Sequence, residues 1–166
     1  ITLNDKSPEI ICLCSRDKRL AKVIDMVGEI TYFTHYNGYE FLIHEIIEQM
    51  LSIKAGAKIY DRLSELCSGN ITPESISCLS DDEIRSTGTS SSKVGYIRSL
   101  TQAIMDKKLV LDILPSLKDS EVIKQLTSIK GIGQWTAKMY LIFVLNRPDV
   151  LPIEDVAFLQ SYKWLY

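Results

Sequence analysis

The sequence of 166 residues is poor in the residue types that build metal or redox centres. Its four cysteines form no Cys-x-x-Cys pair, and their spacings fit no zinc or iron–sulfur motif. The two histidines, His35 and His44, are not at ligand spacing and belong to no recognisable catalytic triad. We therefore expect reduced and mostly buried thiols, and no cofactor requirement.

Long apolar runs and an excess of one charge are missing too. No run approaches the length of a membrane-spanning helix, and the first residues lack the basic-then-apolar pattern of a secretion signal. The formal net charge is −2, whereas a protein that binds nucleic acid indiscriminately is usually basic. We expect an intracellular monomer without a membrane partner, in the cytoplasm or nucleoid of a bacterium or the nucleus of a eukaryote. Binding of DNA through backbone amides and a few local lysines stays open.

Alternating strand patterns of useful length do not occur, and apolar residues recur at helical spacing instead. The chain is long enough for one domain or two small lobes. Thr72-Pro73-Glu74 and Ser80-Asp81-Asp82-Glu83 are typical helix starts, and Gly28 and Gly69 are typical stops. The sequence predicts an all-α fold with helices near residues 20–27, 41–50, 59–66, 97–104, 122–126 and 135–143.

The most informative motif runs from Leu126 to Ala137, where Gly131 and Gly133 lie between two helical patterns. Such a hairpin gathers backbone N–H groups at the start of a helix, and these groups can bind a phosphate without any side chain. Glycine suits the turn because it tolerates positive φ and lets a phosphate approach closely. Asp155, twenty residues after Trp135, supplies a lone carboxylate that can act on the anchored molecule. The alternative is that Asp155 only caps a helix.

The segment Ile129–Ala137, with Leu151–Asp155 after it, resembles the helix-hairpin-helix DNA glycosylase superfamily, and most closely its 3-methyladenine DNA glycosylase II branch. Residues 39–52 are similar to the helix that leads to a DNA-facing turn, and residues 88–97 are similar to a Gly-x-Ser-x-x-Lys-x-x-Tyr-Ile segment. These matches occur in order along the chain.

The resemblance implies a two-lobed, all-α helix-hairpin-helix glycosylase fold over residues 1–166. Residues of about 1–38 and 156–166 would contribute to an N- and C-terminal lobe. Residues of about 39–155 would form a central lobe that carries the hairpin 126–137. In the family, further helices follow the catalytic aspartate, so the C-terminal helices are expected to be absent from this sequence.

The resemblance also implies base excision: an alkylated purine such as 3-methyladenine is flipped out of damaged double-stranded DNA, and its N-glycosidic bond is hydrolysed. Asp155 would be catalytic, because bond cleavage builds positive charge on the deoxyribose that a carboxylate stabilises. Trp135 stands where lyase-competent relatives carry a lysine able to form a Schiff base, which implies a monofunctional glycosylase. Trp135 and Tyr39 are expected to line the base pocket, and core packing is the alternative for both.

The remaining site residues concern DNA binding. Gln49 and Met50 align with the turn that fills the gap left by the flipped base, where an apolar side chain can wedge into the stack. For Met50, the alternative is the end of a core stripe. Lys93 is expected to lie on a solvated helix start, with an approach to the backbone as the alternative. The other expected DNA contacts are Lys130, Gly131, Ile132, Gly133 and Thr136, and the family's monovalent cation (Na⁺ or K⁺) would bind the carbonyls of Thr127, Ile129 and Ile132.

Two other functions stay open at this point. One is a helix-hairpin-helix module that binds DNA without catalysis. The other is a glycosylase for oxidised or mismatched bases, although Trp135 in place of lysine argues against its lyase-type members.

Overall fold

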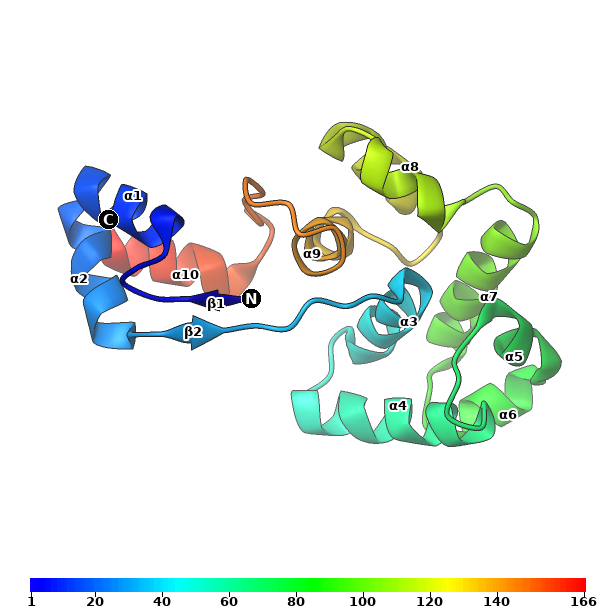
Figure 1. Cartoon of the computed structure of the whole chain (residues 1–166). Helices are drawn as coiled ribbons and strands as arrows, with labels where there is room; N and C mark the ends of the chain where they lie inside the picture. Colours follow the sequence, from blue (N-terminus) through cyan, green and yellow to red (C-terminus); the bar gives the residue numbers. More distant parts are fainter. The chain divides into compact units, whose positions relative to one another are not determined.

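The computed structural model describes all 166 residues, which divide into two compact units (Figure 1). Unit 1 comprises Ile1–Thr34 and Pro152–Tyr166, and unit 2 comprises His35–Leu151. The predicted all-α fold is confirmed, apart from one small sheet. In unit 1 the elements are β1 (Thr2–Leu3), α1 (Pro8–Arg16), α2 (Lys18–Val27), β2 (Ile30–Thr31) and α10 (Val156–Leu165). In unit 2 they are α3 (Gly38–Glu48), α4 (Ile53–Leu66), α5 (Pro73–Cys78), α6 (Asp81–Ser86), α7 (Ser91–Met105), the 3₁₀ helix η1 (Leu111–Ser116), α8 (Asp119–Thr127) and α9 (Gln134–Phe143).

Unit 1 combines three helices with the antiparallel pair β1 and β2, in which Thr2 faces Thr31 and Leu3 faces Ile30. Strands of two residues carry no alternating pattern, which is why the sequence did not indicate them. Asp17 ends α1 and caps α2, because its carboxylate accepts from the amides of Arg19 and Leu20. The Tyr166 hydroxyl donates to the same carboxylate and lowers the pKa of Asp17, so α10 is tied to the corner between α1 and α2.

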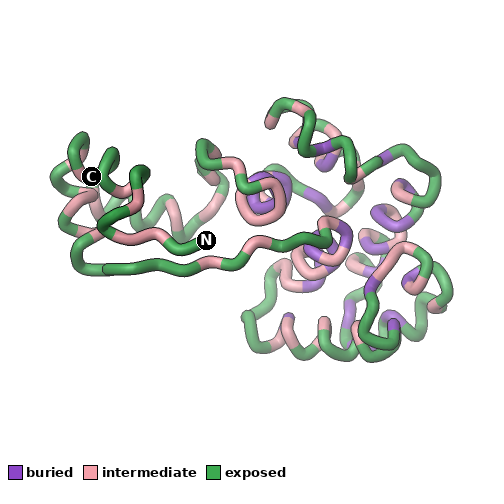
Figure 2. Tube along the Cα trace, viewed as in Figure 1, coloured by how far each residue is buried: buried purple, intermediate pink, exposed green.

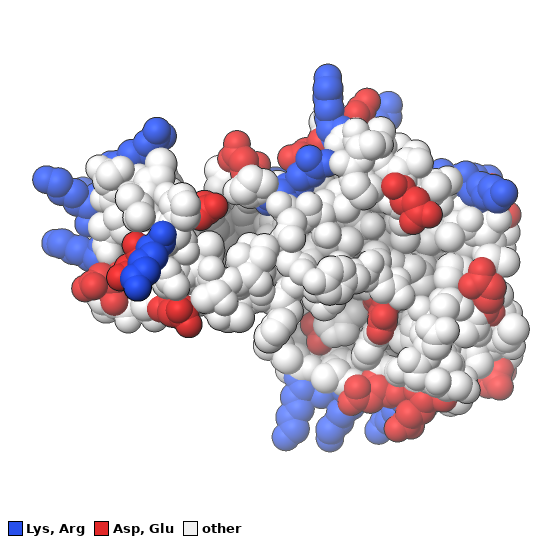
Figure 3. Space-filling model, in the orientation of Figure 1, with Lys and Arg blue, Asp and Glu red and all other residues white.

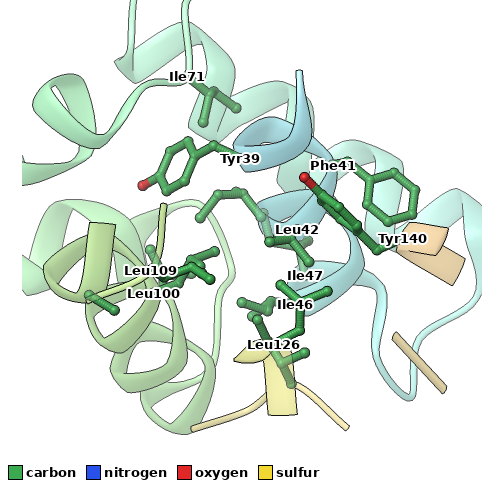
Figure 4. Close-up of a cluster of buried hydrophobic side chains, with 14 of the residues drawn as sticks. Tyr39, Phe41, Leu42, Ile46, Ile47, Ile71, Leu100, Leu109, Leu126 and Tyr140 are labelled. Atoms are coloured by element: carbon green, nitrogen blue, oxygen red, sulfur yellow. The ribbon is translucent and has the colours of Figure 1, made fainter. Parts of the chain in front are cut away.

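The hydrophobic core lies in unit 2, where Figure 2 shows the buried residues. Helix α3 is its centre and contacts α4, α7 and α9. Its core-facing residues repeat at helical spacing and are fully buried, and each contributes about 1.5–3 kcal/mol by leaving water. They are Leu42, Ile43, Ile46 and Ile47, drawn in part in Figure 4. This packing fixes α3 and α9, which carry the candidate site.

Local helix signals are confirmed at several positions. Thr72 and Ser80 both form capping boxes at the starts of α5 and α6. Gly28 and Gly69 follow helices with φ of 73° and 79°, a conformation that favours glycine. No helix of the structure is long and apolar enough to cross a membrane.

The cysteines form no disulfide, but the expectation of mostly buried thiols is wrong. Cys67 is buried, Cys14 is half-buried, and Cys12 and Cys78 are exposed. The reason is local: α1 carries no buried residue at all, and Cys78 is the last residue of the short helix α5.

Candidate functional site

The hairpin between α8 and α9 requires glycine at Gly131 for two independent reasons. Its φ is +94°, in the region that L side chains avoid. An added Cβ would also overlap the Tyr96 side chain, lying only 2.6 Å from its Cδ2 atom. The turn therefore packs directly on the ring of Tyr96 from α7, and its shape depends on that contact.

Gly133 has a different role. Its φ of −93° and ψ of 177° are extended and open to any residue, so positive φ is confirmed only at Gly131. Gly133 is the N-cap of α9, and no side chain caps the first amides of this helix. A Cβ at Gly133 would meet no atom within 4 Å. The start of α9 is thus an open cluster of N–H groups at the positive end of a helix dipole, which suits an anion.

The other expected DNA contacts on the hairpin differ in what they can offer. Lys130 is exposed and can meet a phosphate directly, whereas Ile132 and Thr136 are buried and offer only backbone groups. The Ile132 amide already donates to the Ile129 carbonyl at 3.1 Å. The geometry therefore favours the amides of Gly131, Gly133 and the first turn of α9 as the phosphate site, and it argues against Ile132.

The hairpin offers backbone carbonyls to a cation, and no group of three or more His, Cys, Asp or Glu side chains in the structure is placed to hold a metal ion. Thr127 is the last residue of α8, so its carbonyl lacks a partner within the helix. The Ile129 carbonyl accepts one hydrogen bond and keeps a second lone pair. Thr127 and Ile129 thus each have a carbonyl lone pair to offer to a cation such as Na⁺ or K⁺.

The turn after α3 projects an apolar side chain into solvent. Met50 has a φ of +58°, which is uncommon for a residue other than glycine, and its side chain is fully exposed at 101%. The alternative that Met50 completes a core stripe is therefore wrong. The preceding residue fastens this turn to the hairpin, because the Gln49 Nε2 group donates to the Gly131 carbonyl at 2.8 Å. We call residues 49–51 the wedge turn.

Because the resemblance implies base excision, replacing Met50 with alanine is expected to slow base release from a paired lesion about tenfold, since the gap left by the base is no longer filled. Folding stability should stay within about 0.5 kcal/mol, since the side chain contacts nothing. Single-turnover assays and thermal unfolding measure both effects. Met26→Ala is the matched control, because Met26 is 79% exposed on α2. Equal rates for the two variants would contradict the wedge role.

Of the two aromatic residues expected in the base pocket, Tyr39 is wrongly placed there. Its side chain is only 4% exposed and lies in the core with Ile71, Leu100 and Leu109 (Figure 4). Its hydroxyl bonds to the Thr101 hydroxyl at 2.7 Å, and burial raises the pKa of Tyr39. The physical reason is its position on the same face of α3 as the core-facing residues.

Trp135 is the second residue of α9 and packs partly against the core of unit 2. Trp135 is half-buried as a whole. This placement is compatible with stacking on a base and with core packing alike.

Asp155, in unit 1, is the N-cap of α10, and its Oδ1 atom accepts from the Phe158 amide at 2.7 Å. A carboxylate at this point gains from the helix dipole in its ionised form. The cap also fixes the rotamer of the side chain, so capping and chemistry are compatible. The chain leading to Asp155 is fastened at the end of unit 2, where Lys138 Nζ donates to the Leu151 carbonyl at 3.0 Å.

The prediction for Lys93 is wrong, and the structure gives it a more specific place. Its ammonium is half-buried and donates to the carbonyls of Ile47 and Gln49 at 2.7 and 2.6 Å, at the end of α3. The signal in the sequence was a lysine in the first turn of a helix, where a cation is unfavourable.

Positive charge forms no broad patch on the face shown in Figure 3, where charges of both signs are interspersed. Several arginines of unit 2 donate side-chain hydrogen bonds to backbone carbonyl groups. Arg62 donates to Thr87, Arg98 to Ile76 and Leu79, and Arg147 to Pro115 and Leu117. These guanidinium groups are therefore less available to a phosphate than an exposed lysine such as Lys130.

A helical fold, a hairpin that leads into a helix start without a side-chain cap, and an exposed wedge turn fastened to that hairpin are features that suit a DNA-binding protein of the helix-hairpin-helix class. Residues 43–166 match the model of the HhH-GPD superfamily of base excision DNA repair proteins. The DNA-3-methyladenine glycosylase 1 of Schizosaccharomyces pombe is 32% identical over 152 residues, which are 90% of this chain and 67% of that protein. The chain therefore belongs to the HhH-GPD superfamily.

Two solved structures extend the comparison. The DNA-3-methyladenine glycosidase of Bacillus halodurans is 38% identical, with a TM-score of 0.90 over all of this chain and 77% of its own. The 3-methyladenine DNA glycosylase of S. pombe, solved in complex with abasic DNA, is 32% identical, with a TM-score of 0.83 over 96% of this chain and 80% of its own.

Proposed function

We propose that this protein is a monofunctional DNA glycosylase of base excision repair that hydrolyses the N-glycosidic bond of alkylated purines, such as 3-methyladenine, in double-stranded DNA. The observation that carries the proposal is the hydrogen bond from Gln49 to the Gly131 carbonyl, which joins the wedge turn to the phosphate-binding hairpin. Holding the backbone and filling the stack at one place is what flipping a base requires. The glycosylases similar to this chain at 32–38% identity support the choice of an alkylated purine.

The chemistry assigned to Asp155 follows from the lesion. A purine nucleotide methylated at N3 or N7, such as that of 3-methyladenine, is positively charged, so the bond between C1′ and the base breaks with its electron pair going to the base, which leaves neutral. The deoxyribose then carries positive charge, which the Asp155 carboxylate stabilises electrostatically. Water adds to C1′, and its proton passes to the carboxylate and then to solvent. No strong general acid is required.

Trp135 determines what the enzyme leaves behind. An indole cannot form a Schiff base with the sugar, so the product is an intact abasic site rather than a cut strand. A cationic base that stacked on the indole ring would gain from its π face. Both statements concern the reaction and are tested by its products.

The remaining parts of the proposal concern cofactors and location. No cofactor takes part in the reaction. A Na⁺ or K⁺ ion on the carbonyls of Thr127, Ile129 and Ile132 would stabilise the hairpin beside a phosphate. The protein acts as a monomer on DNA inside the cell, in the nucleoid of a bacterium or the nucleus of a eukaryote.

A panel of duplexes tests the proposal, each with one 3-methyladenine, 7-methylguanine, 8-oxoguanine or mismatch. Strand cleavage is measured under single-turnover conditions with and without hot alkali, beside duplexes without enzyme. We expect alkali-dependent cleavage at the methylated purines only. Release of oxidised bases alone would defeat the alkylation assignment, and cleavage without alkali would defeat the monofunctional one. Binding without release of any base would identify a binding module.

A further inference from the structure

Lys93 joins two helix ends that are distant in sequence. It is the third residue of α7, whose N-cap is Ser90. Its side chain leaves α7 and reaches the C-terminal end of α3, where it donates to the carbonyls of Ile47 and Gln49. A cation in the first turn of its own helix is unfavourable, whereas a cation at the last carbonyls of another helix is favourable. The favourable contact of Lys93 with α3 therefore offsets its unfavourable position in the first turn of α7.

The contact with the Gln49 carbonyl controls the wedge turn directly. The carbonyl of Gln49 and the amide of Met50 share one planar peptide unit. Fixing the direction of this carbonyl fixes the ψ of Gln49, which is 126°, and with it the plane of the amide from which Met50 starts its left-handed φ of +58°. A left-handed conformation at a methionine is unfavourable and persists only where its surroundings enforce it.

A second contact holds the same turn from the other side. The Gln49 side chain donates to the Gly131 carbonyl at 2.8 Å. The main chain of Gln49 is thus held by Lys93 and its side chain by the hairpin. Met50 is the next residue, and its exposed side chain takes its direction from both contacts.

We propose that Lys93 is a positioning residue that locks the wedge turn, so that Met50 enters the base stack when the hairpin binds the backbone. This inference rests on the proposed function and names a residue that acts through Met50 rather than on the base. It predicts that loss of Lys93 impairs flipping of the lesion and leaves the later chemical step intact.

The experiment compares one methylated purine in two duplexes, opposite its normal partner and opposite an abasic-site analogue, where less unpairing is needed. Lys93→Met should lower the single-turnover rate on the paired lesion about tenfold, and by less than about threefold on the unpaired one. Lys93→Arg should restore the wild-type ratio, because its guanidinium can donate to both carbonyls. The double variant with Met50→Ala should be no slower than the slower single variant.

Arg98→Met is the matched control, since Arg98 also holds helix-end carbonyls, those of Ile76 and Leu79, away from the wedge turn. It should lower stability without changing the ratio of the two rates. The proposal is overturned if Lys93→Met lowers the rates on the paired and unpaired lesions by the same factor. It is also overturned if the fold-reduction in the double variant equals the product of the fold-reductions in Lys93→Met and Met50→Ala. Lys93→Gln, which keeps one donor group, serves if Lys93→Met does not fold, and the same two criteria apply to it.

A second readout does not depend on base release. 2-Aminopurine next to an abasic-site analogue fluoresces more strongly when it is unstacked. Wild-type protein and Arg98→Met should raise this signal on binding, whereas Lys93→Met and Met50→Ala should raise it much less. A wild-type protein that releases no base but raises the signal would defeat the proposed function alone. An equal rise with Lys93→Met would defeat the role of Lys93.

Discussion

Asp155→Asn is expected to lower the rate of base release about 10²–10⁴-fold, the usual range for a residue that assists proton transfer and charge stabilisation. The substitution separates the charge of Asp155 from its capping role, because asparagine is an equally good N-cap and its side-chain oxygen can still accept from the Phe158 amide. Only the negative charge is lost, and DNA affinity should stay near that of the wild type. Single-turnover base release beside binding to a lesion duplex measures the two quantities.

Asp17→Asn supplies the control. Asp17 is also an N-cap aspartate of unit 1, with bonds from the amides of Arg19 and Leu20. If both variants release base at the same rate, then Asp155 only caps α10, and the catalytic assignment fails.

Gly131→Ala is expected to have the largest effect on the fold of the site. Its Cβ would overlap the Tyr96 side chain, and its φ of +94° is unfavourable for alanine. Overpacking costs about 1–3 kcal/mol and a left-handed conformation about 1–2 kcal/mol, so we expect a loss of about 2–5 kcal/mol in the free energy of unfolding. Because the hairpin must shift to relieve the overlap, DNA affinity should fall as well. Denaturant unfolding and fluorescence anisotropy with an abasic duplex measure both.

Gly133→Ala separates stability from binding at the same hairpin. The backbone there is extended, and a Cβ would enter open space, so the unfolding free energy should stay close to the wild-type value. The added methyl group lies at the open start of α9, where a phosphate would approach, and DNA affinity should fall. The account of the hairpin fails if Gly131→Ala unfolds like the wild type, or if Gly133→Ala loses stability but not affinity.

The features that local chemistry determines were predictable from the sequence. The capping boxes at Thr72 and Ser80 and the helix stops at Gly28 and Gly69 depend on neighbours within a few residues. The positive φ at Gly131 in the hairpin and the cap at Asp155 are likewise determined by neighbouring residues. In each case, the signal and its structural consequence lie within one turn of the chain.

The errors concern contacts between distant segments. Tyr39 lies in the core because α3 packs against α7, and the sequence alone does not say which face of α3 meets α7. Lys93 reaches Ile47 across 46 positions, and Gln49 reaches Gly131 across 82. Neither helical spacing nor a cap motif encodes such a pairing. The structure was therefore needed to show that the wedge turn, α7 and the hairpin form one connected assembly.

The central claim is that the protein releases alkylated purines by hydrolysis, and it is tested most directly on methylated genomic DNA. The free bases in the supernatant are separated and quantified over time, with wild-type protein, with Asp155→Asn and without protein. The account predicts that wild-type protein alone releases 3-methyladenine above the spontaneous rate and leaves abasic strands uncut. Equal release in all three samples, while wild-type protein still binds the DNA, would contradict it.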